Sequence, residues 1–398
     1  MQDIKQKFPV FKQNQDLIYL DNAATTQMPK RVIEVLNQYY NNKSNVHRGF
    51  YPLAQQATKA FEEAREKVAE FISSEPKEII FNSGTTEGMN NLARMLEPEL
   101  SADDNIVITI VEHHANFVPW QQLSDRVGCE LRVIELDDEC EFGLQVEGKI
   151  DEDTKVVSFS YISNALGFEL PVKNIVDVAN KVSAYTIIDS AQAMTSKKIN
   201  VKDLNIDFLA FSGHKLFGPT GIGVLYGRKA LLQDLDPSKY GGEMIRKVTK
   251  QSSSWTDIPH KYEAGTPNVT AAIGLGEALD FITDLGIKKI ASYKQELTNY
   301  LIDQLNMLDE VVLLSPENKS LDSGIVSFQV EGVHAHDVAD LLASENICVR
   351  AGHHCAMPLM GEFDVSATVR VSISIYNNKK DIDQLIDELQ NIIQLFNK

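Results

Sequence analysis

Cysteine is scarce in this sequence, and its cysteines are not arranged in pairs. The 398 residues include four, and no two of them form a CxxC motif: Cys129, Cys140, Cys348 and Cys355. A disulfide framework needs a denser, regularly spaced set, and a zinc or redox site of this kind usually needs a CxxC pair. We therefore expect no disulfides, no bound metal and a reduced, cytoplasmic environment.

Long hydrophobic runs and an excess of basic charge are also lacking. No apolar run approaches the roughly 20 residues that span a bilayer, and the N-terminus, MQDIKQKFPVFKQNQ, lacks the apolar core of a signal peptide. The 56 acidic residues outnumber the 38 basic ones, which gives a net charge of −18. Such a charge repels nucleic acid and anionic lipid. We expect neither nucleic acid nor a membrane as a partner.

The hydrophobic pattern predicts an α/β fold. Between the expected strands, apolar residues recur every three or four positions from Ala57 to Phe71, as on a helix that covers a sheet, and Pro29 suits the first position of an earlier helix. This alternation predicts a mostly parallel sheet covered by helices over residues 17–260. The expected strands are 79–81, 106–111, 131–134, 156–160, 185–189 and 208–211.

Beyond Pro267 the pattern changes to that of a smaller α+β lobe. It predicts long helices over 271–308 and a closing helix over 381–396. The strands expected between them are 325–330, 347–349 and 369–373. Because strands and helices are no longer alternating, this lobe is expected to form a separate small sheet.

Three polar groups fall at strand ends, where ligand sites of α/β sheets gather. Lys215 follows strand 208–211 and precedes the glycine-rich GPTGIGVLYG, and Asp189 ends strand 185–189. Such an Asp can keep a pyridine nitrogen protonated, and Gln192 can bond a ring oxygen. Thr85 and Thr86 open a helix, where an anion is favoured. Alone, Lys215 also fits a solvated lysine, and Asp189 or the threonines fit helix caps.

The nucleotide-binding motifs are absent at these positions. Leu216 follows Lys215, so no GxxxxGK[ST] loop is formed, and GIGVLYG lacks the GxGxxG spacing. A phosphate at Thr85 and Thr86 would therefore belong to another kind of ligand.

Cys355 stands apart from the other cysteines. It follows His353 and His354, and Gly352 before them indicates a tight turn. Histidines and an arginine nearby lower the pKa of a thiol and favour the nucleophilic thiolate, although an isolated cysteine is more often an inert buried residue. Zinc bound by His353, His354 and Cys355 is disfavoured, because adjacent side chains do not easily face one ion.

Ten motifs follow one another in a characteristic order along nearly the whole sequence. It resembles the type II, SufS-like cysteine desulfurases, a class V aminotransferase-like group of fold-type I pyridoxal-phosphate enzymes. The motifs are LDNAATT (20–26), NVHRG (45–49), GTTEG (84–88), EHHANFVPW (112–120), SNALG (163–167), DSAQA (189–193), SGHKLFGPTGIGVLYG (212–227), GGEMI (241–245), YEAGTPN (262–268) and RAGHHCAMPLM (350–360).

The resemblance implies a specific architecture. It implies a large cofactor-binding domain (17–265) with a mostly parallel, mixed seven-stranded sheet. It further implies a small C-terminal α+β domain (266–398) that carries the loop of the catalytic cysteine, and an N-terminal segment (1–16) that packs with the small domain.

The resemblance also assigns roles around pyridoxal 5′-phosphate. Lys215 would hold the cofactor covalently and move the Cα proton, while Cys355 would take the substrate's sulfur. Asp189 would pair with the pyridine nitrogen, Gln192 with the phenolic oxygen, and His113 would stack on the ring. The remaining cofactor contacts that it implies are Thr85, Thr86, Ser212, His214 and Asn164, with Gly265 and Thr266 of the partner subunit.

For the substrate and the partners, the resemblance implies L-cysteine, a homodimer with shared active sites and a sulfur acceptor for iron–sulfur cluster assembly. Arg370, Asn164, Arg350 and His47 would contact the substrate. His336 would contact a zinc-containing, SufU-like acceptor, although a surface histidine that caps a helix explains it equally well.

Three other functions stay open. A selenocysteine lyase, and an aminotransferase or lyase that uses no protein thiol, share this fold. A non-catalytic carrier of pyridoxal phosphate, or a sulfur-relay module, would yield no alanine from cysteine.

Overall fold

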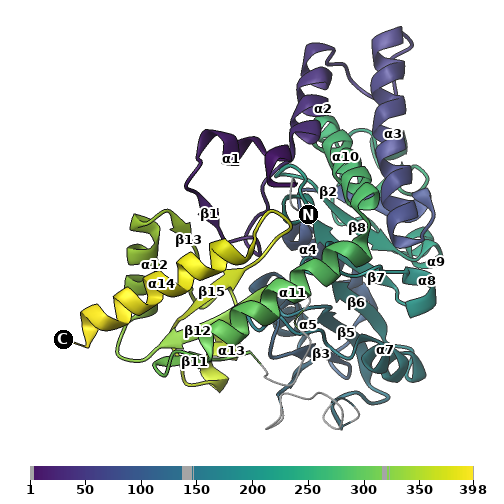
Figure 1. The fold of residues 1–398 in the computed structure, drawn as a ribbon. Coiled ribbons are helices and arrows are strands. Elements are labelled where there is room, and N and C mark those ends of the chain that lie inside the picture. The colour runs from purple at the N-terminus through teal and green to yellow at the C-terminus, as the bar shows by residue number, and fades with distance from the viewer. Residues whose placement is uncertain (1–3, 137–145, 147, 316–320, 322, 398) are drawn as a thin grey trace.

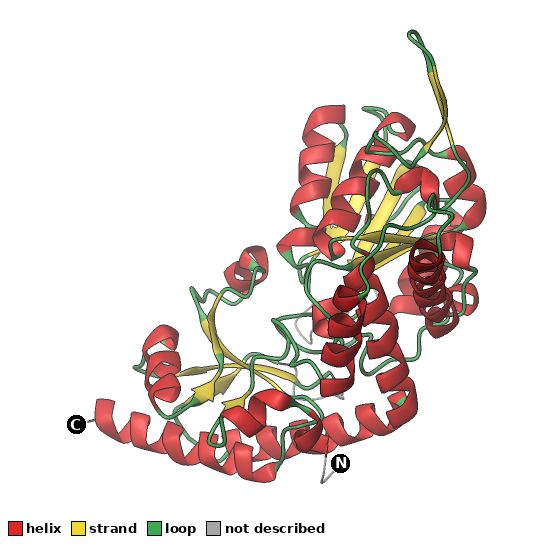
Figure 2. Ribbon diagram, turned by 90° about the horizontal axis from the view of Figure 1, so that it is seen from above, coloured by secondary structure: helices red, strands yellow, loops and turns green. Residues whose placement is uncertain are grey.

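The computed structural model describes residues 4–136, 146, 148–315, 321 and 323–397 (Figure 1). Cys140 lies outside these residues. In Figure 2 most strands fall into a larger and a smaller group, each flanked by helices, and one hairpin projects away from them. In the described part of the chain, no helix is both long and apolar enough to cross a membrane.

The larger group is a seven-stranded sheet, and it confirms the predicted mixed, mostly parallel α/β fold. Only β8 runs antiparallel to the other six strands. All six expected strands are present, but β8 was not predicted, because its glycines in GPTGIGVLYG indicate a loop. In spatial order the strands are β2 (Ile79–Asn82), β8 (Gly223–Gly227), β7 (Phe208–Ser212), β6 (Tyr185–Asp189), β5 (Thr154–Ser160), β3 (Asn105–Thr109) and β4 (Glu130–Ile134).

Helices cover both faces of this sheet, so successive strand residues enter different cores. In β3, Ile106 and Ile108 pack in one apolar cluster while Val107 packs in the other, as the alternation of a strand requires. The helices in this part of the chain are α2 (Lys30–Asn41), α3 (Pro52–Ile72), α4 (Thr85–Leu96), α5 (Val118–Val127), α7 (Val172–Lys181), α8 (Val201–Leu204), α9 (Lys229–Asp234) and α10 (Val269–Leu285).

One helix start differs from the prediction. Pro29 is the residue before α2 rather than its first residue, since its extended ψ of 152° lies outside the helical range. The long helices predicted over 271–308 are α10 and α11 (Ile287–Leu305), and Gly286, whose φ is +84°, ends α10 between them.

The smaller group is a four-stranded antiparallel sheet. Its spatial order is β11 (Val311–Leu313), β12 (Ile325–Val330), β15 (Thr368–Ser372) and β14 (Arg350–Gly352). The helices α12 (Ala335–Ser344), α13 (Met357–Glu362) and α14 (Lys379–Phe396) belong to this part of the chain. A separate hairpin consists of β9 (Ile245–Val248) and β10 (Ser253–Trp255).

The N-terminal segment contacts both parts of the molecule. After α1 (Pro9–Gln13), strand β1 (Ile18–Tyr19) pairs in parallel with β13 (Ile347–Cys348). The fully buried Phe8 ring packs against Phe217, Phe281 and Tyr376, with ring centroids 5.9, 5.9 and 4.7 Å away. The domain boundaries at residues 16 and 265 stay a prediction.

We predict that Phe8→Ala lowers the free energy of unfolding by about 3–5 kcal/mol, because it leaves a cavity among three aromatic rings. Urea unfolding followed by far-UV circular dichroism measures this change. Phe396→Ala is the matched control, since that ring is 47% exposed, and its effect is expected to stay below about 1 kcal/mol. Equal effects of the two substitutions would contradict the packing role of Phe8.

Candidate active site

A cavity of about 240 Å³ opens where β6 and β7 end and where the smaller sheet approaches them. It brings together residues from sequence positions 23 to 370. Eleven of the predicted site residues line it: Thr85, Thr86, His113, Asn164, Asp189, Ser212, His214, Lys215, Arg350, Cys355 and Arg370.

Lys215 and Asp189 enter this cavity from neighbouring strands. Lys215 ends the short turn η5 (Gly213–Lys215) that directly follows β7, and Asp189 is the last residue of β6. Enclosure by the protein lowers the pKa of Lys215 and raises that of Asp189, while the charge of each partly opposes the shift of the other. Asp189 also accepts the backbone N–H of Ala191 at 2.9 Å. The cavity therefore holds an amine that loses its proton more readily than an exposed lysine does.

The N-terminus of α4 forms another wall. Thr85 donates its N–H to Ser212 Oγ at 2.8 Å, and the two hydroxyl oxygens lie 2.9 Å apart. Gly84 permits this approach, because its φ is +152° and a Cβ there would lie 3.1 Å from Ser212 Oγ. A helix N-terminus with two threonines and a serine is a suitable site for a phosphate.

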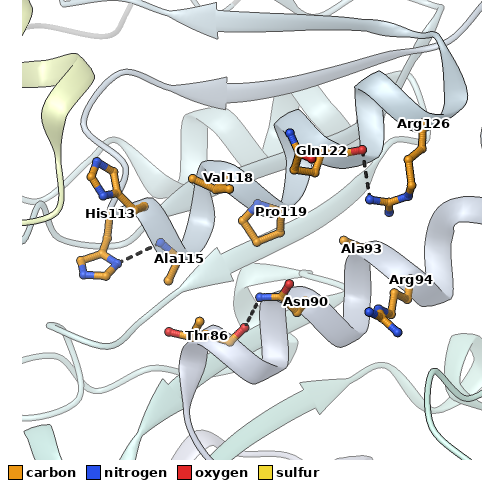
Figure 3. A pocket seen from close by; sticks show the side chains of 11 residues that line it. Thr86, Asn90, Ala93, Arg94, His113, Ala115, Val118, Pro119, Gln122 and Arg126 are labelled. Carbon is orange, nitrogen blue, oxygen red and sulfur yellow. Dashed lines mark hydrogen bonds between the residues drawn. The ribbon is translucent and has the colours of Figure 1, made fainter.

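His113 separates this cavity from a second one. Its Nδ1 accepts the N–H of Ala115 at 3.0 Å, so the neutral ring carries its proton on Nε2. Burial lowers the pKa of His113 to about 3, and the charges of Lys215, His114 and Arg370 contribute. Figure 3 shows the adjoining cavity of about 400 Å³ between α4 and α5, where His113 and Thr86 form a shared wall. His113 is therefore an uncharged ring at neutral pH.

Glu112, which the sequence analysis did not single out, supports this histidine. Its carboxylate is completely buried and accepts hydrogen bonds from the Thr109 hydroxyl, the Asn116 amide at 2.6 Å, and the Ser160 hydroxyl and N–H at 2.6 and 2.9 Å. These bonds tie β3, β5 and the turn η4 (His114–Asn116) together. Even with four donors, burial raises the pKa of Glu112 to about 7.

Cys355 lies in a loop with an unusual backbone. His354 and Cys355 have φ values of +52° and +56°, and Gly352 has +124°. Two consecutive residues with side chains in the left-handed region are strained and persist only when neighbours hold them. The expected turn is present, but it lies at His354 and Cys355 themselves, shortly after Gly352 ends β14.

Neighbouring elements hold the Cys355 loop. His114 donates its backbone N–H to the Cys355 carbonyl at 2.7 Å, and the Asn164 amide donates to the His354 carbonyl at 2.6 Å. The buried His354 ring contacts the Thr368 hydroxyl at 2.8 Å. Since Asn164 follows β5 and Thr368 begins β15, groups from both sheets fix the position of the thiol.

Two arginines and an aspartate lie at one end of the cavity. Arg370 donates to the Asn164 carbonyl at 2.9 Å and contacts Asp21 at 3.4 Å, as Arg350 also does. The side chain of Arg370 is only 3% exposed, and burial lowers its pKa to about 10. Asp21 belongs to the motif LDNAATT, and no role was predicted for it from the sequence.

The other predicted residues lie outside this cavity in the single chain. Gln192 donates to the carbonyl of Ala23, a cavity residue, at 2.9 Å. His47 and Gly265 line a separate cavity of about 270 Å³, and Thr266 follows Gly265. His336 lies in the first turn of α12, and His334 is the residue that caps this helix. The alternative in which His336 caps the helix is therefore wrong, because the helix begins one residue before it.

The possible metal ligands that the structure brings together near Cys355 differ from the three that were considered from the sequence. His354 turns to Thr368, and atoms of His114, His353 and Cys355 lie within 4.8 Å of one another. Both rings already accept backbone N–H groups, His353 Nδ1 from Cys355 at 3.0 Å and His114 Nε2 from Met357 at 3.1 Å. A neutral imidazole has one lone pair, so binding a metal would require breaking these bonds.

The groups in the cavity fit pyridoxal phosphate. The α4 N-terminus suits the phosphate, Lys215 the aldehyde and Asp189 the pyridine nitrogen. Among the described residues, three buried polar atoms around the cavity, Asn164 Oδ1, His354 Nδ1 and Arg370 Nε, have no hydrogen-bond partner. A buried polar atom without a hydrogen-bond partner destabilises the folded state. A polar ligand that forms hydrogen bonds with these atoms would therefore stabilise the site.

Comparisons with known proteins agree with this geometry. The family model described as aminotransferase class-V matches residues 18–385. The chain belongs to the class-V aminotransferase family. Within it, the chain is 45% identical to a probable cysteine desulfurase of Halalkalibacterium halodurans, over 99% of this chain and 98% of the relative. It is 40% identical to the cysteine desulfurase of Haloferax volcanii, over 96% and 90% of the two chains.

A solved structure supports the same grouping. The apo structure of the cysteine desulfurase from Thermococcus onnurineus has a TM-score of 0.94 and 38% identity, and the match covers 99% of this chain and 98% of that one. This class-V aminotransferase is thus a member of the cysteine desulfurase group, and the resemblance that its motifs indicated is confirmed.

We predict a characteristic pH dependence for Glu112→Gln in this class-V aminotransferase. The wild-type folded state keeps the Glu112 proton up to about pH 7, whereas the usual pKa is 4.5, so between these values the unfolded state loses the proton first. The stability of the wild type relative to the variant should therefore fall as the pH rises from about 4.5 to about 7, by on the order of 3 kcal/mol.

Urea unfolding at pH 5, 6, 7 and 8 measures this difference, with the exposed Glu152→Gln as the control. A stability difference between wild type and Glu112→Gln that stays constant over this range would show that the buried carboxylate titrates normally.

Proposed function

We propose that this protein is a pyridoxal-phosphate-dependent cysteine desulfurase that converts L-cysteine to L-alanine, with the sulfur held as a persulfide on Cys355. The observation that carries the proposal is that Lys215, Asp189 and Cys355 line one cavity although they come from distant parts of the chain. The relatives are named cysteine desulfurases, and one polar cavity of this chain holds the amine, the carboxylate and the thiol that such a reaction uses.

The cofactor contacts follow the walls of the cavity. Pyridoxal phosphate, when bound, supplies an electron-withdrawing ring that stabilises negative charge on the substrate's Cα. Thr85, Thr86, Ser212 and His214 hold its phosphate, and His113 covers the ring face as a neutral group. Asp189 keeps a proton on the ring nitrogen, while Gln192 and Asn164 contact the ring oxygen.

The protein's own groups then carry out the sulfur transfer. Lys215 removes the Cα proton, which its lowered pKa favours. The Cys355 thiolate attacks the substrate's sulfur, so that an S–S bond forms and the C–S bond breaks with its electron pair left on carbon. Protonation of that carbon, and return of a proton to Cα from Lys215, give alanine. Arg370 and Arg350 hold the substrate's carboxylate, because a guanidinium can bind both carboxylate oxygens.

A homodimer completes the site in this proposal. His47 and Gly265 lie together in a cavity separate from that of Lys215. In a dimer with shared active sites, this cavity, with Thr266 beside it, would face the partner's cofactor phosphate and substrate. The buried Arg65 fixes this region, since it pairs with Glu263 at 2.7 Å and with Glu62 at 2.9 Å.

We predict that Cys355→Ala lowers alanine formation from L-cysteine at least a hundredfold, by an order-of-magnitude estimate, because the sulfur loses its nucleophile. Purified protein is incubated with L-cysteine, and alanine and enzyme-bound persulfide are measured. Cys129→Ala is the control, since Cys129 is buried directly before β4, and it should keep both products. Undiminished alanine formation in Cys355→Ala would remove the desulfurase assignment and favour a lyase that uses no protein thiol.

The acceptor is proposed to be a SufU-like, zinc-containing protein of iron–sulfur cluster assembly, and His336 its contact. His336 is exposed, and its Nε2 lies 3.9 Å from the position of a Cβ on Gly352, in the loop of Cys355. An imidazole at this place can reach a metal that is brought to the thiol.

We predict that His336→Ala abolishes the stimulation of alanine formation by such an acceptor and leaves the activity without acceptor unchanged. His334→Asn is the matched control, because His334 stacks on His336 with ring centroids 5.1 Å apart and caps α12, and asparagine preserves the cap. Equal stimulation of wild type and His336→Ala would exclude this contact.

A further inference from the structure

We propose that Asp21 sets the net charge of the substrate's carboxylate site and thereby selects amino acids with one carboxylate over those with a second anionic group. This inference rests on the proposed function in one respect, since it takes Arg370 and Arg350 as the groups that bind the substrate's carboxylate. Asp21 acts through these arginines and is a positioning residue.

The two arginines are forced together by the smaller sheet. Arg350 in β14 and Arg370 in β15 are directly opposite each other in an antiparallel pair. Directly opposed residues project from the same face of a sheet, and like charges in this arrangement repel each other. Asp21 contacts both guanidinium groups at 3.4 Å, so its carboxylate offsets the repulsion.

The position of Asp21 is fixed by its backbone neighbours. Ser372 donates its N–H to the Leu20 carbonyl at 2.7 Å, and its hydroxyl accepts the N–H of Ala23 at 2.9 Å. The Asn22 amide donates to the Ser372 carbonyl at 2.6 Å. The segment that carries Asp21 is therefore fastened to β15 two residues beyond Arg370, and the carboxylate has little freedom to move.

Asp21 balances the arginines without using up their donors. Its contacts of 3.4 Å are long for charged hydrogen bonds. The buried Arg370 Nε has no partner among the described residues. Arg370 and Arg350 line the cavity, whereas Asp21 is not among the lining residues described for it. An incoming carboxylate therefore meets guanidinium donors that Asp21 does not occupy.

The charges of Arg350, Arg370 and Asp21 together determine which substrates the site is expected to prefer. Two arginines and one aspartate leave a net charge of +1 at this end of the cavity, which one carboxylate neutralises. A substrate with a second anionic group, such as a dicarboxylic amino acid or an amino acid sulfinate, would bring an excess negative charge into a partly buried place. Without the charge of Asp21 the site would carry +2, and that penalty would disappear.

The test is a binding titration of the holoenzyme with L-alanine and L-aspartate, followed by the absorbance of the cofactor. Asp21→Asn should lower the ratio of the L-aspartate Kd to the L-alanine Kd about tenfold, the order expected when one unit charge is removed near a partly buried ligand. Asp21→Glu keeps the charge and should keep the wild-type ratio. Asp151→Asn, which removes an aspartate paired with Arg132, is the matched control outside the cavity.

Arg350→Gln provides a test in the opposite direction, even if Asp21→Asn fails to fold. It lowers the local charge and should raise the ratio of the two Kd values. An unchanged ratio in a responsive Asp21→Asn or Arg350→Gln variant would overturn the inference about Asp21. A wild-type protein that shows no absorbance response to any amino acid would instead overturn the proposed function, so the two failures are distinguishable.

Discussion

The attachment of residues 20–26 to both sheets is the constraint on which the site depends. At one end of this segment, Ser372 of the smaller sheet bonds Leu20 and Ala23. At the other end, Thr26 donates its N–H to the carbonyl of His214 at 2.8 Å, next to Lys215. One short segment therefore sets the distance between the lysine of the larger sheet and the arginines of the smaller one.

This constraint explains why a buried polar segment is retained between two apolar cores. The Tyr376 hydroxyl bonds the Asn22 side chain, and it also accepts the N–H of Gln27 at 3.0 Å. The ring of Tyr376 packs on Phe8 and Phe11 with centroids 4.7 and 4.9 Å away. Because the polar groups are satisfied by one another, they fix a unique geometry at little desolvation cost.

The sequence predicted the parts of the site that local patterns mark. Lys215 and Asp189 were identifiable because each follows a short apolar strand, and the catalytic role of Cys355 came from the joint pattern of motifs. The strand β8 was missed because its residues are buried between β2 and β7, where packing outweighs the low strand preference of glycine. The local sequence of β8 does not indicate that β2 and β7 will lie on either side of it.

Asp21 and Glu112 were missed for a different reason. Both stand within quoted motifs, but their roles come from partners that are far away in the sequence. Asp21 contacts Arg350 and Arg370, and Glu112 contacts Ser160. An isolated acidic residue in a sequence gives no sign of the charge or hydrogen-bond donors that the fold will place around it.

The charges of the cavity follow from this enclosure. Burial lowers the pKa of His113 most, and the positive charges of Lys215 and Arg370 lower it further, so the ring is uncharged at neutral pH. Its neutral ring, with the proton on Nε2, can cover an aromatic ligand without adding to the charges of Lys215 and Arg370. Glu112, the residue before His113, accepts four hydrogen bonds, so a second buried group holds the backbone that carries the ring.

Neighbouring residues hold the strained backbone at His354 and Cys355 in place. Left-handed conformations at two consecutive residues cost of order 1–3 kcal/mol each, and the bonds from His114, Asn164 and Thr368 offset this cost. Thr368 belongs to β15, while His114 lies in η4 and Asn164 follows β5. A thiol on a freely moving loop would approach the substrate's sulfur in many orientations, whereas this loop holds it at the cavity wall. The strained backbone is therefore the consequence of holding the Cys355 thiol between the larger and the smaller sheet.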